Sequence, residues 1–386
     1  MKRIVIVGAG SAGVMAANRM RREFSRDGAE ITIIERSDRH IYQPGFVTLL
    51  FDLDKPENLI RPTKDLLLQG INLIIDEVTS IDQKKNKVTT AKYGDISYDY
   101  LVIATGAKLY LDEPEGMKEG LEKGENVFTF YTMEGATKLR DALKKFEGGT
   151  IVSSIAEMPI KCLAAPVKFI MLAESTMRRM GIRDKCKFVF TTPTLSVPPN
   201  IEPYASTLDT MLKARGIEVI LDFTPATVEA KSGILEDFRG NRVNFDLLSI
   251  TPPHMGEEVI QNSEGIGDAL GWVPCHKNSL MHRSFDNIYV IGDAGNFPSA
   301  KTASGARIQA KVLAQRIKAH IRGEVPKATY DGHTICPIMT RYGRAMFAEF
   351  NYTKSISPAS ESYIKWLIHV HVIRRLYWNF MLKGLF

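Results

Sequence analysis

A glycine-rich stretch near the N-terminus constrains the fold of this chain more than any other feature. Residues 8–13 read Gly-Ala-Gly-Ser-Ala-Gly and directly follow the apolar run 4–7. Between a strand and a helix, the first glycine permits a tight turn, the second lets the backbone approach a pyrophosphate, and the third lets the helix pack on the strand. The apolar run 31–34 then ends in an acid suited to ribose hydroxyls. The pattern predicts a doubly wound α/β dinucleotide-binding domain with these site residues: Gly8, Gly10, Ala12, Gly13 and Glu35.

Length and composition set the broad class. A chain of 386 residues has room for two domains, and 44% hydrophobic with 24% charged residues is typical of a globular protein. The net charge of +6 comes without a basic cluster or a nucleic-acid module, so we predict no nucleic-acid partner. Four cysteines in a chain this long make a disulfide framework improbable, so their local context decides whether any has a redox role.

Two later segments favour FAD over NAD in the first nucleotide site. The apolar run 100–103 leads into Ala-Thr-Gly at 104–106, and the run 287–291 leads into Gly-Asp at 292–293. With the glycine motif, they resemble the FAD-dependent pyridine nucleotide-disulfide oxidoreductase superfamily from residue 1 to about residue 320. This resemblance implies that the aspartate binds the ribitol of FAD and that a helix opening after residue 301 directs its N-terminus at the flavin. The residues it adds to the site are Thr105, Gly106, Gly292, Asp293, Lys301 and Thr302.

Superfamily members that oxidise NAD(P)H carry a second glycine fingerprint, and this chain lacks it. The strand expected at 150–154 is followed by Met158, Pro159 and then Cys162 instead of glycines. A nicotinamide donor is therefore not expected to bind in the usual way. The runs 187–191 and 218–221 still predict a second doubly wound domain. A degenerate fingerprint that binds NADH remains the alternative.

Two cysteines stand in segments that sharpen the resemblance. Cys162 lies within 161–168 and Cys336 within 330–337, and together with 40–45, 298–303 and 348–352 these segments resemble the sulfide:quinone oxidoreductase family. The likeness is greatest to the two-cysteine branch that includes the mitochondrial enzymes, although Ala164 replaces the glycine that relatives have. It also assigns Gln43 to the cofactor site.

The resemblance implies a specific sulfur chemistry. Sulfide attacks a disulfide or sulfur-bridged form of Cys162 and Cys336, which leaves a persulfide on one sulfur and a thiolate that reacts with the flavin. By analogy, Cys336 reacts with the flavin and Cys162 holds the sulfane sulfur. Lys161 and Lys168 are local sources of the positive charge that a thiolate needs. Cys275 and His276 do not have the spacing of a zinc site, so we predict no metal.

The C-terminal region predicts membrane contact. Residues 364–382 place aromatic and aliphatic side chains on one helical face and basic side chains on the other, which is typical of an interfacial helix. The apolar face consists of Trp366, Val370, Ile373, Tyr377 and Phe380, and the opposite face of Lys365, His369, Arg375, Asn379 and Lys383. No apolar run reaches 18 residues, so the expected state is a peripheral, monotopic membrane protein on an undetermined face. An ordinary packing helix is the alternative.

A quinone entering from the membrane is the electron acceptor that the family implies. The candidate ring contacts are Phe347, Phe350 and Tyr342, and the candidate proton relays are His254 and His333. Each aromatic residue suits a protein core equally well, and either histidine suits a capping or solvent-exposed role.

The predicted architecture is α/β, with two Rossmann-like doubly wound domains and a C-terminal amphipathic helical membrane-binding region. The FAD domain spans 1–106 and 285–330, the second domain 107–284, and the quinone- and membrane-binding region 331–386. The predicted function is oxidation of sulfide to sulfane sulfur with FAD, a sulfur acceptor and membrane quinone. Three alternatives stay open: a type II NADH:quinone dehydrogenase, a sulfide oxidase with a cytochrome partner, and a non-catalytic flavin-binding redox sensor. The sequence does not determine the oligomeric state, and a homo-oligomer is compatible with it.

Overall fold

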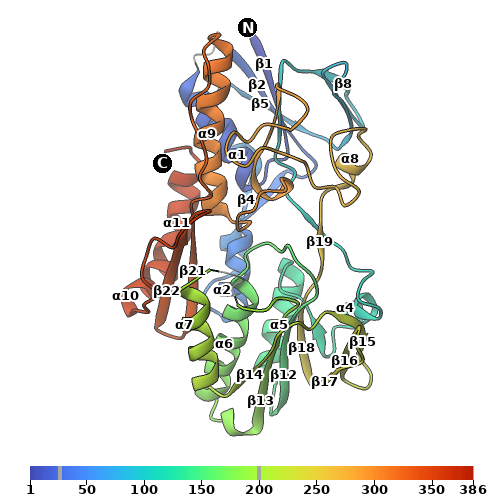
Figure 1. The fold of residues 1–386 in the computed structure, drawn as a ribbon, viewed down its shortest axis with the longest axis vertical. Helices are drawn as coiled ribbons and strands as arrows, with labels where there is room; N and C mark the ends of the chain where they lie inside the picture. The colour runs from blue at the N-terminus through green and yellow to red at the C-terminus, as the bar shows by residue number, and fades with distance from the viewer. Residues whose placement is uncertain (25–27, 198–200, 386) are drawn as a thin grey trace.

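A computed structural model describes residues 1–24, 28–197 and 201–385. Figure 1 shows two lobes, with the N-terminal strands in the upper lobe and the strands of the middle of the chain in the lower one. The upper lobe is built on a parallel sheet in the order β20-β9-β1-β2-β5. Its strands are β1 (Lys2–Val7), β2 (Ala29–Glu35), β5 (Ile71–Ile75), β9 (Tyr100–Ile103) and β20 (Ile288–Val290).

Helices pack against this sheet, which explains the near-continuous apolar strands. The helices α1 (Ser11–Glu23) and α9 (Ala303–Ile321) lie side by side and come from distant parts of the chain. Smaller elements complete the lobe: β3 (Arg39–Ile41), α2 (Phe46–Leu50), β4 (Ile60–Pro62), α3 (Thr63–Leu66), and the antiparallel sheet of β6 (Val78–Asp82), β7 (Lys87–Thr90) and β8 (Gly94–Ser97).

The lower lobe is a second doubly wound unit, as predicted. Its parallel sheet has the order β11-β18-β12-β13-β14. The strands are β11 (Val127–Phe128), β12 (Gly149–Ile155), β13 (Cys186–Thr191), β14 (Ile217–Ile220) and β18 (Leu247–Thr251). Around them lie α4 (Met117–Lys123), α5 (Met133–Lys144), α6 (Ala165–Arg179), α7 (Tyr204–Ala214) and a small antiparallel sheet of β15 (Pro225–Glu229), β16 (Ile234–Asp237) and β17 (Arg242–Asn244).

The chain crosses between the lobes on two paired strands. The outgoing strand β10 (Lys108–Leu109) pairs antiparallel with the returning strand β19 (His254–Met255). After the return, α8 (Glu258–Gln261) packs on β6, where the Ile81 amide donates to Ser263 Oγ at 2.8 Å. The segment after β19 therefore belongs by its packing to the upper lobe. The boundary predicted at 284/285 lies after this return. Residues 256–284 add no strand to either parallel sheet, so no strand pattern in the sequence marked the point of return.

The C-terminal region begins with a hairpin that touches both lobes. Strands β21 (Thr334–Arg341) and β22 (Arg344–Phe350) pair antiparallel, and β21 contacts both α6 and α9. In Figure 1 the hairpin stands between α9 and α7. Any side chain on β21 is thus held where the two lobes meet.

The remaining helical chain, residues 363–385, is called here the C-terminal segment. It contains α10 (Tyr363–Leu367), a π-helical turn (Ile368–Val372), α11 (Ile373–Leu376) and a second π-helical turn (Tyr377–Met381). The face that we expected to enter a membrane packs inward, because Trp366 and Tyr377 are buried. These two rings contact Tyr342 and Tyr42 respectively, while Phe380 from the same predicted face stays exposed.

A membrane-spanning helix is not found in the part of the chain that the structure describes: no helix there combines sufficient length with sufficient apolar character.

Candidate active site

One cavity of about 980 Å³ extends from the glycine-rich loop to the start of α6 and the C-terminal segment. It gathers most of the residues that the sequence nominated, although they come from six separate stretches of chain. Those that line it are Gly8, Gly10, Ala12, Glu35, Gln43, Thr105, Gly106, Cys162, Gly292, Asp293, Lys301, Thr302, Cys336 and Phe347. Those that lie outside its lining are Gly13, His254, His333, Tyr342 and Phe350.

The glycine loop has the geometry that a dinucleotide requires. Gly8 adopts a φ of +98°, and a Cβ on Gly13 would stand 1.8 Å from the Gly8 carbonyl oxygen, so these two positions exclude larger residues. A Cβ on Gly10 would meet nothing within 4 Å. The loop therefore presents open backbone at the N-terminus of α1, where a diphosphate is favoured.

Three further groups fit an FAD molecule in this cavity. Glu35 Oε2 accepts from the Ala9 amide at 2.6 Å, so this carboxylate anchors the loop and faces the ribose position. Thr105 Oγ1 is buried and has no hydrogen-bond partner within the protein. Burial raises the pKa of the Asp293 carboxyl, although Lys301 and Lys161 oppose the shift. An orphaned hydroxyl and a desolvated carboxyl are the groups that a ribitol chain can satisfy.

Two lysines brace the cavity wall near Asp293. Lys301 Nζ donates to the carbonyls of Asp293 and Gly295 at 2.7 and 2.9 Å, and Lys161 Nζ donates to Gln43 Oε1 at 3.3 Å. Burial lowers the pKa of both ammonium groups, while the Asp293 charge opposes that shift. Thr302 caps α9 by accepting from the Gly305 amide, as the predicted helix start requires.

Cys162 sits on a constrained turn just before α6. Its φ is +54°, its amide donates to the Lys301 carbonyl at 2.9 Å, and its own carbonyl accepts from the Ala165 amide at 2.8 Å. Lys168, one helical turn further on, is buried and places Nζ 3.4 Å from Cys162 Sγ. The ammonium and the helix N-terminus together stabilise negative charge on this sulfur.

Cys336 reaches the same cavity from β21. Its thiol is buried opposite Ala348 of β22, and burial raises its pKa. The charge on Cys162 raises that pKa further, and the charge on Lys168 opposes the rise, so the three groups interact. The structure thus brings together two free thiols that lie far apart in the sequence: Cys162 Sγ lies 3.4 Å from Lys168 Nζ, and Cys336 is buried beside them.

The other two cysteines have structural surroundings. Burial raises the pKa of Cys275 to about 12, and its sulfur lies 3.6 Å from Asn296 Oδ1. Cys186 starts β13, and its thiol donates to the Ile182 carbonyl at 3.3 Å. Within the described ranges, no three histidine, cysteine or acidic side chains are grouped to hold a metal ion.

The aromatic residues proposed for a quinone separate in the structure. Phe347 lines the cavity. Phe350 packs beside Tyr204, and Tyr342 lies under the Arg179 guanidinium and beside Trp366. Successive strand residues alternate between faces, so Phe347 and Phe350, three positions apart, point to opposite sides of β22.

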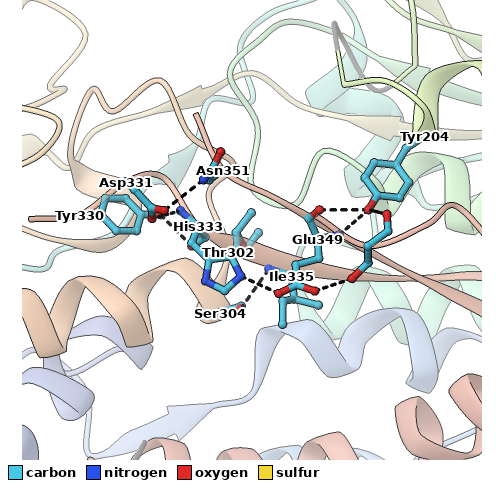
Figure 2. Close-up of polar contacts among 11 residues, drawn as sticks. Tyr204, Thr302, Ser304, Tyr330, Asp331, His333, Ile335, Glu349 and Asn351 are labelled. Atoms are coloured by element: carbon cyan, nitrogen blue, oxygen red, sulfur yellow. Dashed lines mark hydrogen bonds and ion pairs between the residues drawn. The ribbon is translucent and has the colours of Figure 1, made fainter. Parts of the chain in front are cut away.

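Neither predicted relay histidine lies in the cavity lining. Figure 2 shows His333 against Glu349, whose Oε1 is 2.8 Å from His333 Nε2, in a polar cluster that also holds Tyr204. His254 is buried against Tyr131, and burial lowers its pKa to about 3. Both histidines therefore stabilise structure around the cavity, His333 on the β21–β22 hairpin and His254 at the crossover between the lobes.

His40 lines the cavity, and so does His369 of the C-terminal segment. The Nδ1 of His369 is buried and has no hydrogen-bond partner within the protein, and burial together with the charge of Lys168 lowers its pKa to about 3. Sequence reasoning placed His369 on the solvent side of the predicted helix. The sequence signal for a cavity position was its spacing from Ile373. The two residues are four positions apart and share a helical face, and Ile373 also lines the cavity.

Replacing Lys168 with methionine tests the charge on Cys162. We expect alkylation of Cys162 by iodoacetamide at neutral pH to slow by about tenfold, because the ammonium that stabilises the reactive thiolate is lost. Peptide mass spectrometry of the reduced protein measures the rate at each cysteine. Lys187→Met, at an exposed residue of β13, is the control and should leave the rate unchanged. An equal rate in Lys168→Met and the control would show that the contact does not activate Cys162.

Comparison with known proteins agrees with this geometry. The family model described as pyridine nucleotide-disulphide oxidoreductase matches residues 2–157. The mitochondrial sulfide:quinone oxidoreductase of Dictyostelium discoideum is 32% identical over 99% of this chain and 86% of its own length. The X-ray structure of the Aquifex aeolicus sulfide:quinone oxidoreductase superposes with a TM-score of 0.84 at 23% identity, covering 100% of this chain and 92% of the other. A type II NADH:quinone oxidoreductase of Staphylococcus epidermidis is 25% identical over 97% of this chain and 96% of its length.

Proposed function

Because the chain belongs to the sulfide:quinone oxidoreductase family, we propose that it oxidises sulfide to sulfane sulfur at Cys162 and Cys336 and passes the electrons through FAD to a quinone. The observation that carries the proposal is the convergence of both thiols with Lys168 on the cavity that holds the FAD-binding loop. FAD supplies two-electron transfer between sulfur and quinone.

The electrostatics favour one order of events at the two sulfurs. In the oxidised pair, sulfide attacks the sulfur of Cys336, so that a new S–S bond forms there and the bond to Cys162 breaks. Cys162 leaves as the thiolate beside Lys168 Nζ, and the proton of sulfide remains on the Cys336 persulfide or passes to solvent. Atoms and charge balance, since one anion enters and one thiolate forms. This order reverses the roles expected from sequence, because Cys336 has the buried setting that disfavours a thiolate.

A separate sulfur acceptor then has to remove the outer sulfur of the Cys336 persulfide.

Sulfide-driven bleaching of the flavin is the direct test. Under anaerobic conditions, we expect sulfide to reduce the flavin of the purified protein and NADH to leave it oxidised, because β12 is not followed by a glycine fingerprint. Cys162→Ser and Cys336→Ser should each slow the sulfide reaction on the order of 10³-fold, as removal of a nucleophile does. Stopped-flow absorbance of the flavin measures both.

Cys186→Ser is the matched control, because this thiol starts β13 and bonds to a backbone carbonyl. It should react as the unmodified protein does. Bleaching by NADH alone would support the NADH dehydrogenase alternative, and an undiminished sulfide response in both active-site variants would contradict the thiol mechanism.

For the oxidative half of the reaction, we assign the quinone to the part of the cavity between Phe347 and the C-terminal segment. The apolar side chains of the lining include Ile368, Ile373 and Met381 of that segment, and Pro337 of β21. His369 brings the unpartnered ring nitrogen to this region and is electrostatically linked to Lys168. A neutral imidazole can donate its N–H proton to the reduced quinone and accept another from the Lys168 side.

Replacing His369 with leucine separates the two half-reactions. Quinone-dependent reoxidation of the flavin should slow by about 10²-fold, the usual contribution of a proton-transfer group, while sulfide-driven reduction should stay the same. Double-mixing stopped-flow with a short-chain ubiquinone analogue measures both rates. His371→Leu, an exposed neighbour on the same segment, is the control. Equal slowing of both half-reactions would assign His369 a structural role.

We infer that membrane contact involves the outward face of the C-terminal segment, because Trp366 and Tyr377 of the apolar face expected from sequence are buried while Phe380 stays exposed. Ile364 is 69% exposed and Phe380 43% exposed, and Val372 is exposed between them, with Arg375 alongside. An exposed apolar row flanked by a basic side chain suits the headgroup boundary of a bilayer. Quinone would then reach Phe347 and His369 from the lipid side.

Introducing charge on this face should release the protein from membranes. We expect Ile364→Glu with Phe380→Glu to lower binding to anionic phospholipid vesicles by about 10²-fold, since each buried apolar side chain contributes roughly 1.5–3 kcal/mol. Co-sedimentation measures the bound fraction. Leu195→Glu, at a leucine 78% exposed in the lower lobe, is the control. Unchanged binding by the double variant would exclude this face.

A further inference from the structure

The C-terminal segment is bonded directly to the loop that holds the diphosphate. Tyr377 is 1% exposed, and its hydroxyl lies 2.6 Å from both Ser11 Oγ and His40 Nε2. His40 Nδ1 lies 2.9 Å from the Ala9 carbonyl oxygen. One hydroxyl near the end of the chain therefore contacts the first residue of α1 and, through His40, the middle of the glycine loop.

The direction of these bonds follows from the partners. A carbonyl oxygen can only accept, so His40 Nδ1–H donates to Ala9 and Nε2 is left as an acceptor. Burial lowers the pKa of His40 to about 4, which agrees with the neutral ring. Burial also raises the pKa of Tyr377 far above its usual range, so its O–H stays protonated and donates to His40 Nε2. The Tyr377 oxygen then accepts from Ser11 Oγ–H.

These hydrogen bonds fix the two peptide units on either side of the Ala9 Cα. The Ala9 carbonyl is bound by His40, and the Ala9 amide donates to Glu35 Oε2. The free amides that follow at the start of α1 are thereby aimed at the cavity, where a Cβ on Gly10 would meet nothing. A diphosphate bound there meets a loop already held in place by the C-terminal segment.

Contacts further along α1 make the docking cooperative. Asn18 Nδ2 donates to the Leu382 carbonyl at 2.7 Å, and Arg22 Nε donates to the Lys383 carbonyl at 2.7 Å. Trp378 is buried, with the Arg61 guanidinium 4.7 Å over its ring. The segment thus lies along the helix whose N-terminus binds the cofactor.

From these contacts we propose that Tyr377 is a positioning residue that couples FAD retention to docking of the C-terminal segment. FAD binding and segment docking stabilise each other, because each holds the same loop, and such a coupling is reciprocal. The segment whose outer face we propose meets the membrane therefore also holds the glycine loop of the nucleotide site in position. The inference rests on the flavin binding that the proposed function requires.

Tyr377→Phe tests the coupling, because it removes the hydroxyl and leaves His40 Nε2 without a donor. Holoprotein diluted into flavin-free buffer should lose FAD about tenfold faster than the unmodified protein, the scale of one lost buried hydrogen bond. Fluorescence of released FAD measures the rate. Trypsin cleavage after the exposed Arg375 should also accelerate, which reports undocking independently of flavin.

Tyr363→Phe is the matched control, because this tyrosine of the same segment is 53% exposed. It should change neither rate. Ser11→Ala removes the same bond from the loop side, and we expect it to accelerate both FAD loss and cleavage after Arg375. If Tyr377→Phe and Ser11→Ala both retain FAD and resist trypsin like the control, the coupling is wrong. Neither readout involves sulfide, so failure of the proposed sulfide reaction would leave this result intact.

Discussion

The contact between Lys168 Nζ and Cys162 Sγ is the interaction on which the rest of the site depends. Burying an ammonium group is costly unless it has a partner, and here the partner is a sulfur that can carry negative charge. The same ammonium acts on Cys336 and His369. The buried Lys168 ammonium therefore acts on both cavity thiols and on the histidine of the region assigned to quinone.

This arrangement requires that three parts of the chain hold their positions together. Cys162 is fixed by a backbone bond to Lys301, which belongs to the upper lobe, although α6 belongs to the lower one. The hairpin that carries Cys336 is braced by the Glu349 cluster of Figure 2, which links it to Tyr204 of α7. The thiol pair thus forms only when both lobes and the hairpin are in place, and neither lobe alone contains the site.

The C-terminal segment has two different faces. Its inward face packs Trp366, Tyr377 and Trp378 against the protein, where aromatic rings contribute large buried areas. Its outward face carries the smaller exposed apolar row that we propose meets lipid. A helix that used its aromatic face for membrane insertion would leave the glycine loop without the Tyr377 hydroxyl, so protein packing takes precedence over the amphipathic pattern.

The sequence by itself determined the two parallel sheets and the glycine loop, because apolar runs, glycines where a Cβ would clash and acids at strand ends are local signals. It also singled out Cys162 and Cys336, through segments that resemble the sulfide:quinone oxidoreductase family. The return of the chain to the upper lobe, the burial of Trp366 and Tyr377, and the presence of Phe347 and His369 in the cavity lining were decided only by the tertiary structure. The reason is that each depends on which side of an element meets a distant segment. Periodicity identifies the two faces of the helix that carries His369, but only the tertiary structure places this side chain in the cavity lining, where the charge of Lys168 acts on it.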